Sequence, residues 1–460
     1  MEKTVRKKRI NLRSAQLIPI SFLLVIVIGA LLLMLPIAKE GEGSADFTTA
    51  FFTSTTSVCV TGLVVVDTFA YWTLFGKIVI LCLIQIGGFG VITVTSVLIL
   101  MFQKRFSLSR SLLVHDVFNM DTISGVMHFL KVVFKGTFIV EMIGAVLYMG
   151  YFIPEFGWGN GIWYSVFNSI SAFCNAGIDI IGPDSLISYQ SNPYILIVTM
   201  FLIIMGGLGF VVWVDLVRTF RTGRRRKYSP VTMFKHLNEH TKLVLTLTLA
   251  LILIGTLGVL GMEWNNPDTI GNMPFGEKLL NSTFQSVTFR TAGFASVPQD
   301  ALRESTSFFG SIFMFIGGSP VGTAGGVKTV TFFVMLLNAS SFIRNRKENV
   351  VFGRKVTSDM MHKASAIVVV SFAVTLILML ILMTASSVGL TDAMYETFSA
   401  TATVGLSRGL TGSLNTIGRW VIILAMYLGR IGPISMALFF NYNSEGKNKV
   451  RYAQGRFFIG

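Results

Sequence analysis

Four short segments that end in glycine recur along the chain, and the chemistry they offer is that of backbone carbonyls. Their glycines lie 115, 116 and 112 residues apart. A ring of carbonyls can replace the water around an alkali cation, and repetition within one polypeptide can supply such a ring. We therefore predict that the segments surround one axis and bind a cation through carbonyls alone. These four glycine strips are Cys59-Val60-Thr61-Gly62, Cys174-Asn175-Ala176-Gly177, Arg290-Thr291-Ala292-Gly293 and Ala402-Thr403-Val404-Gly405.

A short segment precedes each strip and must position it. The first, Asp46–Ser57, has about 12 residues, which is too few to cross a hydrocarbon core of roughly 30 Å. Such a half-helix is stable at membrane depth only where its backbone is buried in protein or lines a wet cavity. Ser44 or Asp46 is predicted to cap it, and its partly negative C-terminal end favours a cation at the axis. The corresponding half-helices are predicted to begin near Asn160, Gly276 and Asp392.

The composition indicates an integral membrane protein, since 52% of the residues are hydrophobic and 13% are charged. We predict an all-α polytopic fold of four helix–half-helix–helix repeats in a pseudo-four-fold arrangement around one pore. The repeats are predicted as 1–127, 128–240, 241–360 and 361–460. The eight predicted spans are Leu17–Pro36, Gly76–Met101, Val132–Phe152, Pro193–Val217, Lys242–Gly261, Phe308–Phe342, Ala364–Val388 and Ile417–Phe440.

The net charge of +15 is distributed along the chain in a way that favours a membrane topology over nucleic-acid binding. Five segments hold 28 of the 38 Lys and Arg residues, namely 1–16, 102–131, 218–242, 344–363 and 447–456. Short segments with acidic residues alternate with them, so the positive-inside rule predicts both termini in the cytoplasm of a multi-pass cell-membrane protein. Arg224-Arg225-Arg226-Lys227 is mainly a topology signal, with contact to lipid or a partner as the alternative. The run Leu17–Pro36 is predicted to be a retained helix rather than a cleaved signal peptide.

A second glycine motif follows each strip by 24 to 29 residues, at Gly87, Gly206, Gly317 and Gly429, and predicts a kink or break. In the third repeat this motif expands into residues 316–329, which are too rich in Gly, Ser and Thr for an ordinary helix. A phosphate-binding loop is excluded, because Val327 precedes Lys328 and no strand precedes the loop. We predict an intramembrane gate below the strips, formed by Gly317, Gly318, Ser319, Gly322, Thr323, Gly325, Gly326, Lys328 and Arg430.

Three charges fall inside predicted membrane segments. Arg430 is predicted either to place a positive barrier in the ion path or to contact a loop carbonyl or Asp215. For Glu141 we favour a buried polar contact over an ion or proton site. Arg290 is predicted to point away from the axis and tie its strip to the preceding half-helix. The three cysteines, Cys59, Cys82 and Cys174, fit no disulfide framework or metal site and are assigned to packing or lining.

The motifs together resemble the Trk/Ktr/HKT superfamily of potassium transporters, most closely the membrane subunit of the bacterial Ktr uptake system. The resemblance spans nearly the whole chain and rests on Thr61-Gly62-Leu63, Asn175-Ala176-Gly177, Arg290–Phe294, Thr403–Leu406 and Gly429–Pro433. It implies potassium uptake, with sodium stimulation left open and no organic cofactor. It also implies a homodimer with one pore in each protomer and the tail residues Phe458, Ile459 and Gly460 at its interface. A separate cytosolic ring of nucleotide-binding subunits is implied as regulator.

Two departures from the family pattern bear on selectivity. Cys59 and Cys174 stand where threonine or asparagine is expected, whereas Gly62 occurs where serine is associated with sodium preference, so Gly62 favours potassium. A secondary symporter with alternating access is the alternative function, and it predicts two-fold rather than four-fold repeats. An enzyme is disfavoured, because the five histidines lie in or beside predicted cytoplasmic segments and His236 and His240 have no intervening metalloprotease glutamate.

Overall fold

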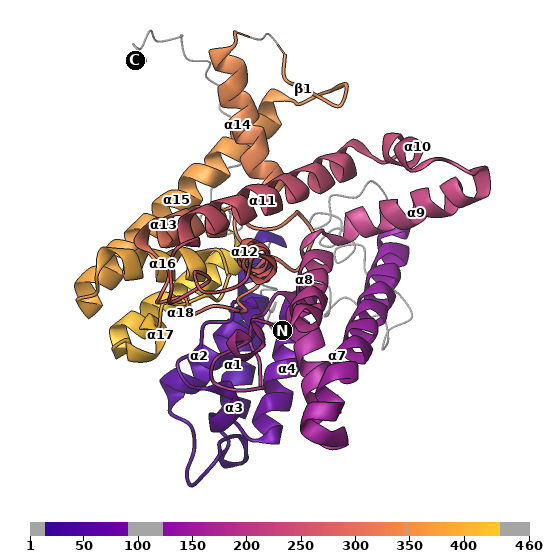
Figure 1. The fold of residues 1–460 in the computed structure, drawn as a ribbon. Helices are drawn as coiled ribbons and strands as arrows, with labels where there is room; N and C mark the ends of the chain where they lie inside the picture. The colour runs from indigo at the N-terminus through magenta and orange to yellow at the C-terminus, as the bar shows by residue number, and fades with distance from the viewer. Residues whose placement is uncertain (1–13, 91–122, 346–347, 433–460) are drawn as a thin grey trace, which may run out of the picture.

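The computed structural model describes residues 14–90, 123–345 and 348–432, whose regular secondary structure is almost entirely helical (Figure 1). Within those ranges the strands are β1 (Val350–Val351) and β2 (Arg354–Lys355), paired in one short antiparallel hairpin. Large apolar side chains such as Leu31, Met142 and Leu257 are exposed on the long helices, as expected of surfaces that face lipid. The predicted all-α class of polytopic membrane protein is confirmed.

The first part of the chain folds as a helix, a half-helix and a second helix. Asp46 caps the half-helix, because its carboxylate accepts hydrogen bonds from the backbone N–H groups of Thr48 (3.0 Å) and Thr49 (3.4 Å). Of the two predicted caps, the structure therefore uses Asp46 rather than Ser44. The elements are α1 (Ser14–Leu33), η1 (Pro36–Ala38), α2 (Phe47–Cys59), α3 (Thr68–Tyr71) and α4 (Leu74–Phe89).

The same order of elements continues along the chain, with one half-helix merged into a longer helix. A break at Gly157, where φ is 78°, separates the long first part of α7 from a second part that leads to Cys174. The later half-helices are α12 and α16. The remaining elements are α7 (Ile123–Cys174), η2 (Ile187–Tyr189), α8 (Pro193–Gly207), α9 (Phe210–Arg226), α10 (Pro230–Lys235), α11 (Glu239–Glu263), α12 (Phe275–Thr288), α13 (Glu304–Phe315), α14 (Thr329–Ile343), α15 (Ser358–Ser386), α16 (Leu390–Thr401), α17 (Leu410–Ser413) and α18 (Thr416–Ile431).

Two predicted spans are interrupted where the second glycine motif predicts a kink or break, near Gly206 and Gly317. The span predicted for Pro193–Val217 divides into α8 and α9, which bend by 98° at the break. The span predicted for Phe308–Phe342 divides into α13 and α14, with an irregular loop between them. In the described part of the chain, 3 helices are long and apolar enough to cross a membrane alone, or up to 4 if the bent pair forms one span. The predicted spans at Gly76–Met101 and Ile417–Phe440 run beyond the described residues.

Glycine explains the bend between α8 and α9. Gly209 has a φ of +89°, and a Cβ added there would lie 2.5 Å from the carbonyl oxygen of Pro320 in the loop before α14. A side chain at this position would be strained by the backbone angle and would also collide with the loop. The bend therefore depends on a contact between two repeats that are distant in sequence.

Three half-helices pack in the same way on the long helix that precedes them in the chain. A glycine of the long helix faces a serine of the half-helix, and the serine hydroxyl donates to a carbonyl of the long helix. Small residues allow this close approach, and the hydrogen bond satisfies the buried hydroxyl. The hydroxyls donate to backbone carbonyl oxygens, from Ser54 to Ile26 (2.7 Å), from Ser169 to Glu141 (2.6 Å) and from Ser286 to Ile252 (2.9 Å). The glycines that face these serines are Gly29, Gly144 and Gly255.

Candidate functional site

The four glycine strips meet and form a closed ring. Each strip glycine faces the carbonyl oxygen of the residue that precedes the glycine of the next strip, and the fourth strip returns to the first. A Cβ added to the first three glycines would lie 2.5, 2.6 and 2.7 Å from those oxygens, so no side chain fits. The pairs are Gly62 with Ala176, Gly177 with Ala292, Gly293 with Val404 and Gly405 with Thr61.

The backbone angles of the strips repeat as well. The glycines have φ values of 102°, 63°, 83° and 98°. The residue two positions before each glycine is also left-handed, with φ of 55° at Val60, 61° at Asn175, 68° at Thr291 and 52° at Thr403. A β-branched residue in this region costs of the order of 1–3 kcal/mol, so the surrounding structure must impose the conformation. Four copies of one strained backbone around one ring indicate a shared function.

Hydroxyl groups of the half-helices hold the strips in place. In the first and fourth strips the glycine N–H donates to a hydroxyl oxygen, whereas in the second and third a hydroxyl donates to the carbonyl after the glycine. Each bond joins the last turns of a half-helix to its strip and fixes the backbone that carries the inward carbonyls. The bonds are Gly62 N to Thr56 Oγ1 (3.0 Å), Gly405 N to Ser399 Oγ (3.0 Å), Ser171 Oγ to Ile178 O (2.5 Å) and Thr288 Oγ1 to Phe294 O (2.6 Å).

Several buried polar atoms of the strips have no hydrogen-bond partner among the described residues. The hydroxyls of Thr61, Thr291 and Thr403 and both side-chain amide atoms of Asn175 are buried without a hydrogen bond. Buried polar groups normally have partners, so this group requires an explanation. Hydroxyl, amide and carbonyl oxygens are hard donors, which suit an alkali cation with or without its water.

One side of the ring opens into a cavity of about 170 Å³, lined by all four strip glycines. Asp67 and Asp179 also line this cavity. Burial raises the pKa of Asp179 to about 7, against hydrogen bonds from Ser185 and from the backbone of Ile181, and the nearby negative charge of Asp67 adds to the rise. The two carboxyl groups place negative charge at this mouth of the ring.

The predicted gate loop lies against the other side of the ring. Gly325 packs against the Thr403 side chain and the carbonyl of Ala402, so the loop reaches the fourth strip. The hydroxyl of Thr323 donates to the carbonyl of Phe173 (3.2 Å), one residue before the second strip. Further bonds anchor the loop to the end of α8, from Ser319 N to Gly207 O (3.0 Å) and from Thr323 N to Gly206 O (3.3 Å). The loop thus spans the space beneath two strips.

Arg430 holds this loop from the last described helix. Its guanidinium donates to the carbonyl oxygens of Thr323 (2.6 Å) and Gly87 (2.5 Å) and so links the loop to α4. The predicted contact to a loop carbonyl is therefore confirmed. The predicted contact to Asp215 is wrong, because that carboxylate accepts instead from Asn238 N and Nδ2, both at 2.9 Å.

The predictions for the two other charged residues inside membrane segments, Glu141 and Arg290, differ in outcome. Glu141 is buried and accepts two hydrogen bonds from Gln85 Nε2, at 3.0 and 3.2 Å, which confirms the predicted buried polar contact. Arg290 is buried too, but its Nε has no hydrogen-bond partner among the described residues. The expected tie between Arg290 and its half-helix is therefore not made through this nitrogen. The predicted interface residues Phe458, Ile459 and Gly460 lie outside the described residues.

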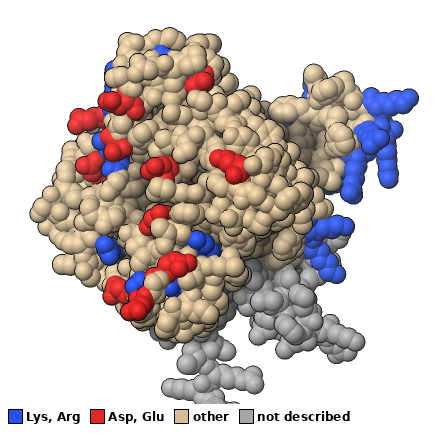
Figure 2. Space-filling model, turned by 60° about the horizontal axis from the view of Figure 1, so that its bottom comes forward, with Lys and Arg blue, Asp and Glu red and all other residues tan. Residues whose placement is uncertain are grey.

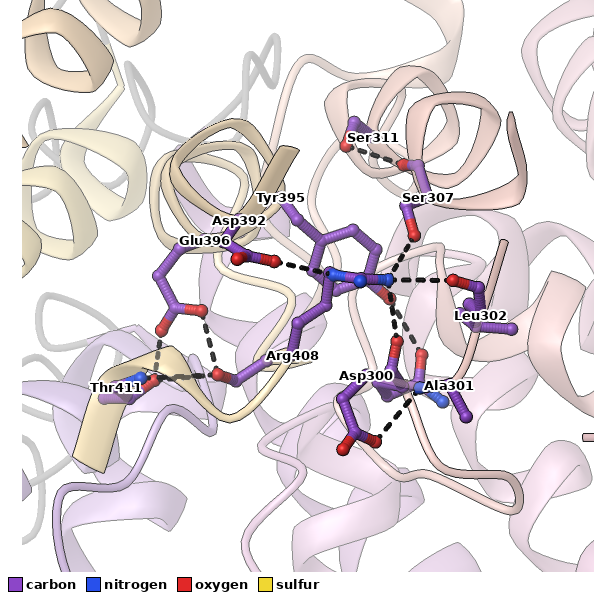
Figure 3. Close-up of polar contacts among 12 residues, drawn as sticks. Asp300, Ala301, Leu302, Ser307, Ser311, Asp392, Tyr395, Glu396, Arg408 and Thr411 are labelled. Carbon is purple, nitrogen blue, oxygen red and sulfur yellow. Dashed lines mark hydrogen bonds and ion pairs between the residues drawn. The ribbon is translucent and has the colours of Figure 1, made fainter. Parts of the chain in front are cut away.

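Sequence reasoning missed a polar network beside the fourth strip, shown in Figure 3. Arg408 forms an ion pair with Asp392 (2.8 Å) and donates to the carbonyls of Gln299 (3.2 Å) and Leu302 (3.0 Å) and to Ser307 Oγ (2.7 Å). These bonds join the loop after the fourth strip to α16, to the loop after the third strip and to the start of α13. The signal available in the sequence was opposite charge at Asp392 and Arg408 across one strip, but the three other partners are about 100 residues away.

Long apolar helices and a closed ring of four glycine strips are typical of integral membrane proteins that pass cations along backbone carbonyls. Comparison with known families agrees. Residues 4–452 match the family TrkH, described as "Cation transport protein". The chain belongs to this TrkH family of cation transport proteins, so it is a transporter rather than an enzyme, as predicted.

The chain is similar to curated relatives along its whole length. It is 38% identical over 453 residues to "Ktr system potassium uptake protein B" of Bacillus subtilis, with 98% of each chain covered. It is 35% identical over 439 residues to "Potassium/sodium uptake protein NtpJ" of Enterococcus hirae, with 94% of each covered. The crystal structure of the potassium transporter TrkH from Vibrio parahaemolyticus matches 96% of this chain and 87% of its own, with a TM-score of 0.73 at 16% identity. That likeness shows a shared fold, and the predicted Trk/Ktr resemblance is confirmed.

Proposed function

We propose that the chain conducts potassium into the cell through the ring of glycine strips. The observation that carries this proposal is the closed cycle in which each strip glycine faces a carbonyl of the next strip. The names of the relatives, which describe potassium and potassium/sodium uptake, support potassium as the ion. Uptake is driven by the membrane potential, which is worth about 2.3 kcal/mol per charge for every 100 mV.

The strips act as the selectivity filter. Their residues 59–62, 174–177, 290–293 and 402–405 supply backbone carbonyls in place of the ion's water, and Gly62 keeps the first strip free of a side chain. The unpartnered hydroxyls of Thr61, Thr291 and Thr403 line the same path. The four filter strips correspond to the repeats 1–127, 128–240, 241–360 and 361–460.

Residues 316–329 act as the gate, with Arg430 as its latch. The loop lies across one mouth of the ring, and its closest contacts are with the second and fourth strips. Ions pass when the loop moves aside, which requires the bonds from Arg430 to break. Deletion of loop residues is expected to raise flux, and unchanged flux would exclude the gate.

The chain works with partners that the sequence suggests. The words "Ktr system" in the relatives' names support a separate regulatory subunit, a cytosolic ring that binds nucleotides. The basic segments 102–131, 218–242 and 344–363 face the cytoplasm with both termini and are available to that ring. Two copies of the chain form a homodimer through their tails at 458–460, and sodium stimulates transport.

The deciding experiment is cation flux into liposomes that contain the purified chain, with potassium, rubidium, sodium and lithium compared. Gly62→Ser places a side chain where φ is +102° and where Ala176 O lies within 2.5 Å. We expect the parent to favour potassium and rubidium over sodium, and the variant to lose most of that preference. Gly43→Ser is the matched control, since Gly43 has a similar φ of +85° with nothing within 4 Å.

A symporter with alternating access remains the alternative. It predicts flux that requires a proton or sodium gradient and that is indifferent to Gly62. Potassium flux driven by voltage alone, with selectivity that depends on Gly62 and not on Gly43, excludes this alternative.

A further inference from the structure

A large open groove lies far from the strips, between α9, α10 and the start of α11. Its volume is about 740 Å³. Apolar side chains form most of its wall, among them Val217, Phe220, Phe234 and Leu245. Arg221 and Arg224, one helical turn apart on α9, complete the lining. The groove therefore combines a long apolar surface with two adjacent positive charges.

The position of α9 suits the surface of a membrane. Because α9 bends by 98° from α8, it runs across the direction of that helix instead of continuing through the bilayer (Figure 1). Val217 and Phe220 remain 51% and 59% exposed, so α9 offers apolar surface to its surroundings. A helix that carries exposed apolar residues together with arginines, whose long side chains can reach the headgroups, is typical of the membrane interface.

The surroundings of the groove are strongly basic. Residues 216–245 contain eight Lys or Arg residues and one acidic residue, Glu239. That carboxylate is itself paired with Arg354 at 3.4 Å. Figure 2 shows the result as a dense group of Lys and Arg side chains on the projecting arm at the right, where α9 and α10 lie. The complementary ligand carries an apolar chain and a negative head.

We propose that this groove binds one anionic phospholipid of the cytoplasmic leaflet. An acyl chain lies along Val217, Phe220 and Phe234, and the headgroup phosphate lies on Arg221 and Arg224. A protein partner would match the charge but has no reason to fill a groove that opens beside exposed apolar residues at the interface. The leaflet follows from the proposed topology, whereas binding itself is independent of the proposed transport function.

The groove is built on fixed elements, and one of its helices, α9, touches the proposed gate loop at its other end. Asp215 of α9 is buried and bonded to Asn238 at the start of α11, so the two helices that frame the groove are held together. At the other end of α9, Phe210 N donates to the carbonyl of Val321 in the loop (2.8 Å). A lipid that restrains α9 therefore also restrains one anchor of the loop.

Lipid binding to the purified full-length chain in neutral detergent tests the proposal. Phosphatidylglycerol and phosphatidylcholine with identical acyl chains are titrated, and native mass spectrometry counts bound lipid. We expect tighter binding of phosphatidylglycerol and about 30-fold weaker binding after Arg221→Gln with Arg224→Gln, the loss expected for two basic residues at an anionic lipid. Val217→Trp, which fills the groove without changing charge, is expected to weaken binding as well.

The matched control is Arg218→Gln with Arg225→Gln, which removes the same charge from exposed positions of α9 outside the groove lining. Binding within about twofold of the parent is expected. Equal losses in both double variants, or equal affinity for the two lipids, would overturn the proposal. Glycerol phosphate without acyl chains that competes as well as the lipid would also overturn it. The proposal would also be overturned if no lipid bound and a cytosolic partner protected residues 216–245 from hydrogen exchange.

Discussion

The two mouths of the ring of strips are built differently. On the side of the cavity with Asp67 and Asp179, side-chain bonds join the loops of neighbouring repeats, most extensively around Arg408 (Figure 3). On the side of loop 316–329, the connections are mostly single backbone hydrogen bonds, with Arg430 as the one charged side chain that crosses from another repeat in the described region.

This difference matches what each mouth has to do. A filter that discriminates between cations needs oxygens at fixed positions, and cross-linking of its loops supplies rigidity. A gate must open at a modest free-energy cost, so it belongs among the least stable parts of the structure. Substitutions on one side should therefore change stability, and substitutions on the other should change flux.

The largest expected effect is on stability, from Arg408→Ala. The substitution leaves Asp392, the carbonyls of Gln299 and Leu302 and the hydroxyl of Ser307 without this partner, which costs about 4 kcal/mol at roughly 1 kcal/mol for each lost bond. The temperature of half-inactivation of purified protein in detergent measures the loss. Arg419→Ala is the control, because Arg419 bonds carbonyls of Leu414 and Gly412 within its own repeat. An equal fall in the temperature of half-inactivation in both variants would mean that bonds between distant segments stabilise the protein no more than bonds within one segment.

The next effect is on flux, from Arg430→Gln. The variant replaces two charge-assisted hydrogen bonds by at most one neutral hydrogen bond. The free energy that holds the loop closed falls by about 1.5 kcal/mol, so we expect a roughly tenfold rise in potassium flux into liposomes.

Lys328→Gln distinguishes a latch from an electrostatic barrier. The Lys328 ammonium bonds Ala324 O (2.6 Å), within the same loop, so its loss removes a charge without freeing the loop from α18. A latch predicts little change in flux for this variant, whereas a barrier predicts a rise like that of Arg430→Gln. If Arg430→Gln did not yield folded protein, both the latch and the barrier would be contradicted, and Arg430 would have a structural role instead.

Sequence reasoning located the parts of the site that are local. Each strip and its half-helix lie within about 16 neighbouring residues, so glycine spacing and the cap at Asp46 were enough to place them. It failed where distant segments decide the conformation. The bend at Gly209 depends on Pro320, which is distant in sequence, and three of the four partners of Arg408 lie between residues 299 and 307. Periodicity within one segment carries no information about such contacts.

A smaller effect on flux is expected from Thr323→Val. This change keeps the shape of the side chain and removes the hydroxyl bond to Phe173 O, worth about 1 kcal/mol, so flux should rise about fivefold. Thr384→Val is the control, since Thr384 bonds carbonyls of its own helix, at Leu380 and Ile381. A rise of the same size in both variants would show that the bond to the second strip does not hold the gate.

The smallest effect is a pH dependence at the opposite mouth. Because the pKa of Asp179 is raised to about 7, acidification outside from pH 8 to 6 neutralises a carboxylate beside the ring, and we expect inward potassium flux to fall about twofold. Asp179→Asn should remove the dependence, whereas Asp184→Asn, in the same loop but outside the cavity lining, should keep it. A pH profile shared by all three proteins would exclude Asp179 as the group that titrates.

The raised pKa of Asp179 also determines how the free energy of unfolding changes with pH. The unfolded carboxyl has its ordinary pKa of 3.8 and loses its proton first, whereas the folded one keeps its proton up to about 7. The folded state therefore binds more protons between these values, and the free energy of unfolding falls as the pH rises from about 4 to about 7. Asp179→Asn should flatten this slope. A fall in flux on acidification thus accompanies a gain in stability, which separates loss of cation attraction from acid unfolding.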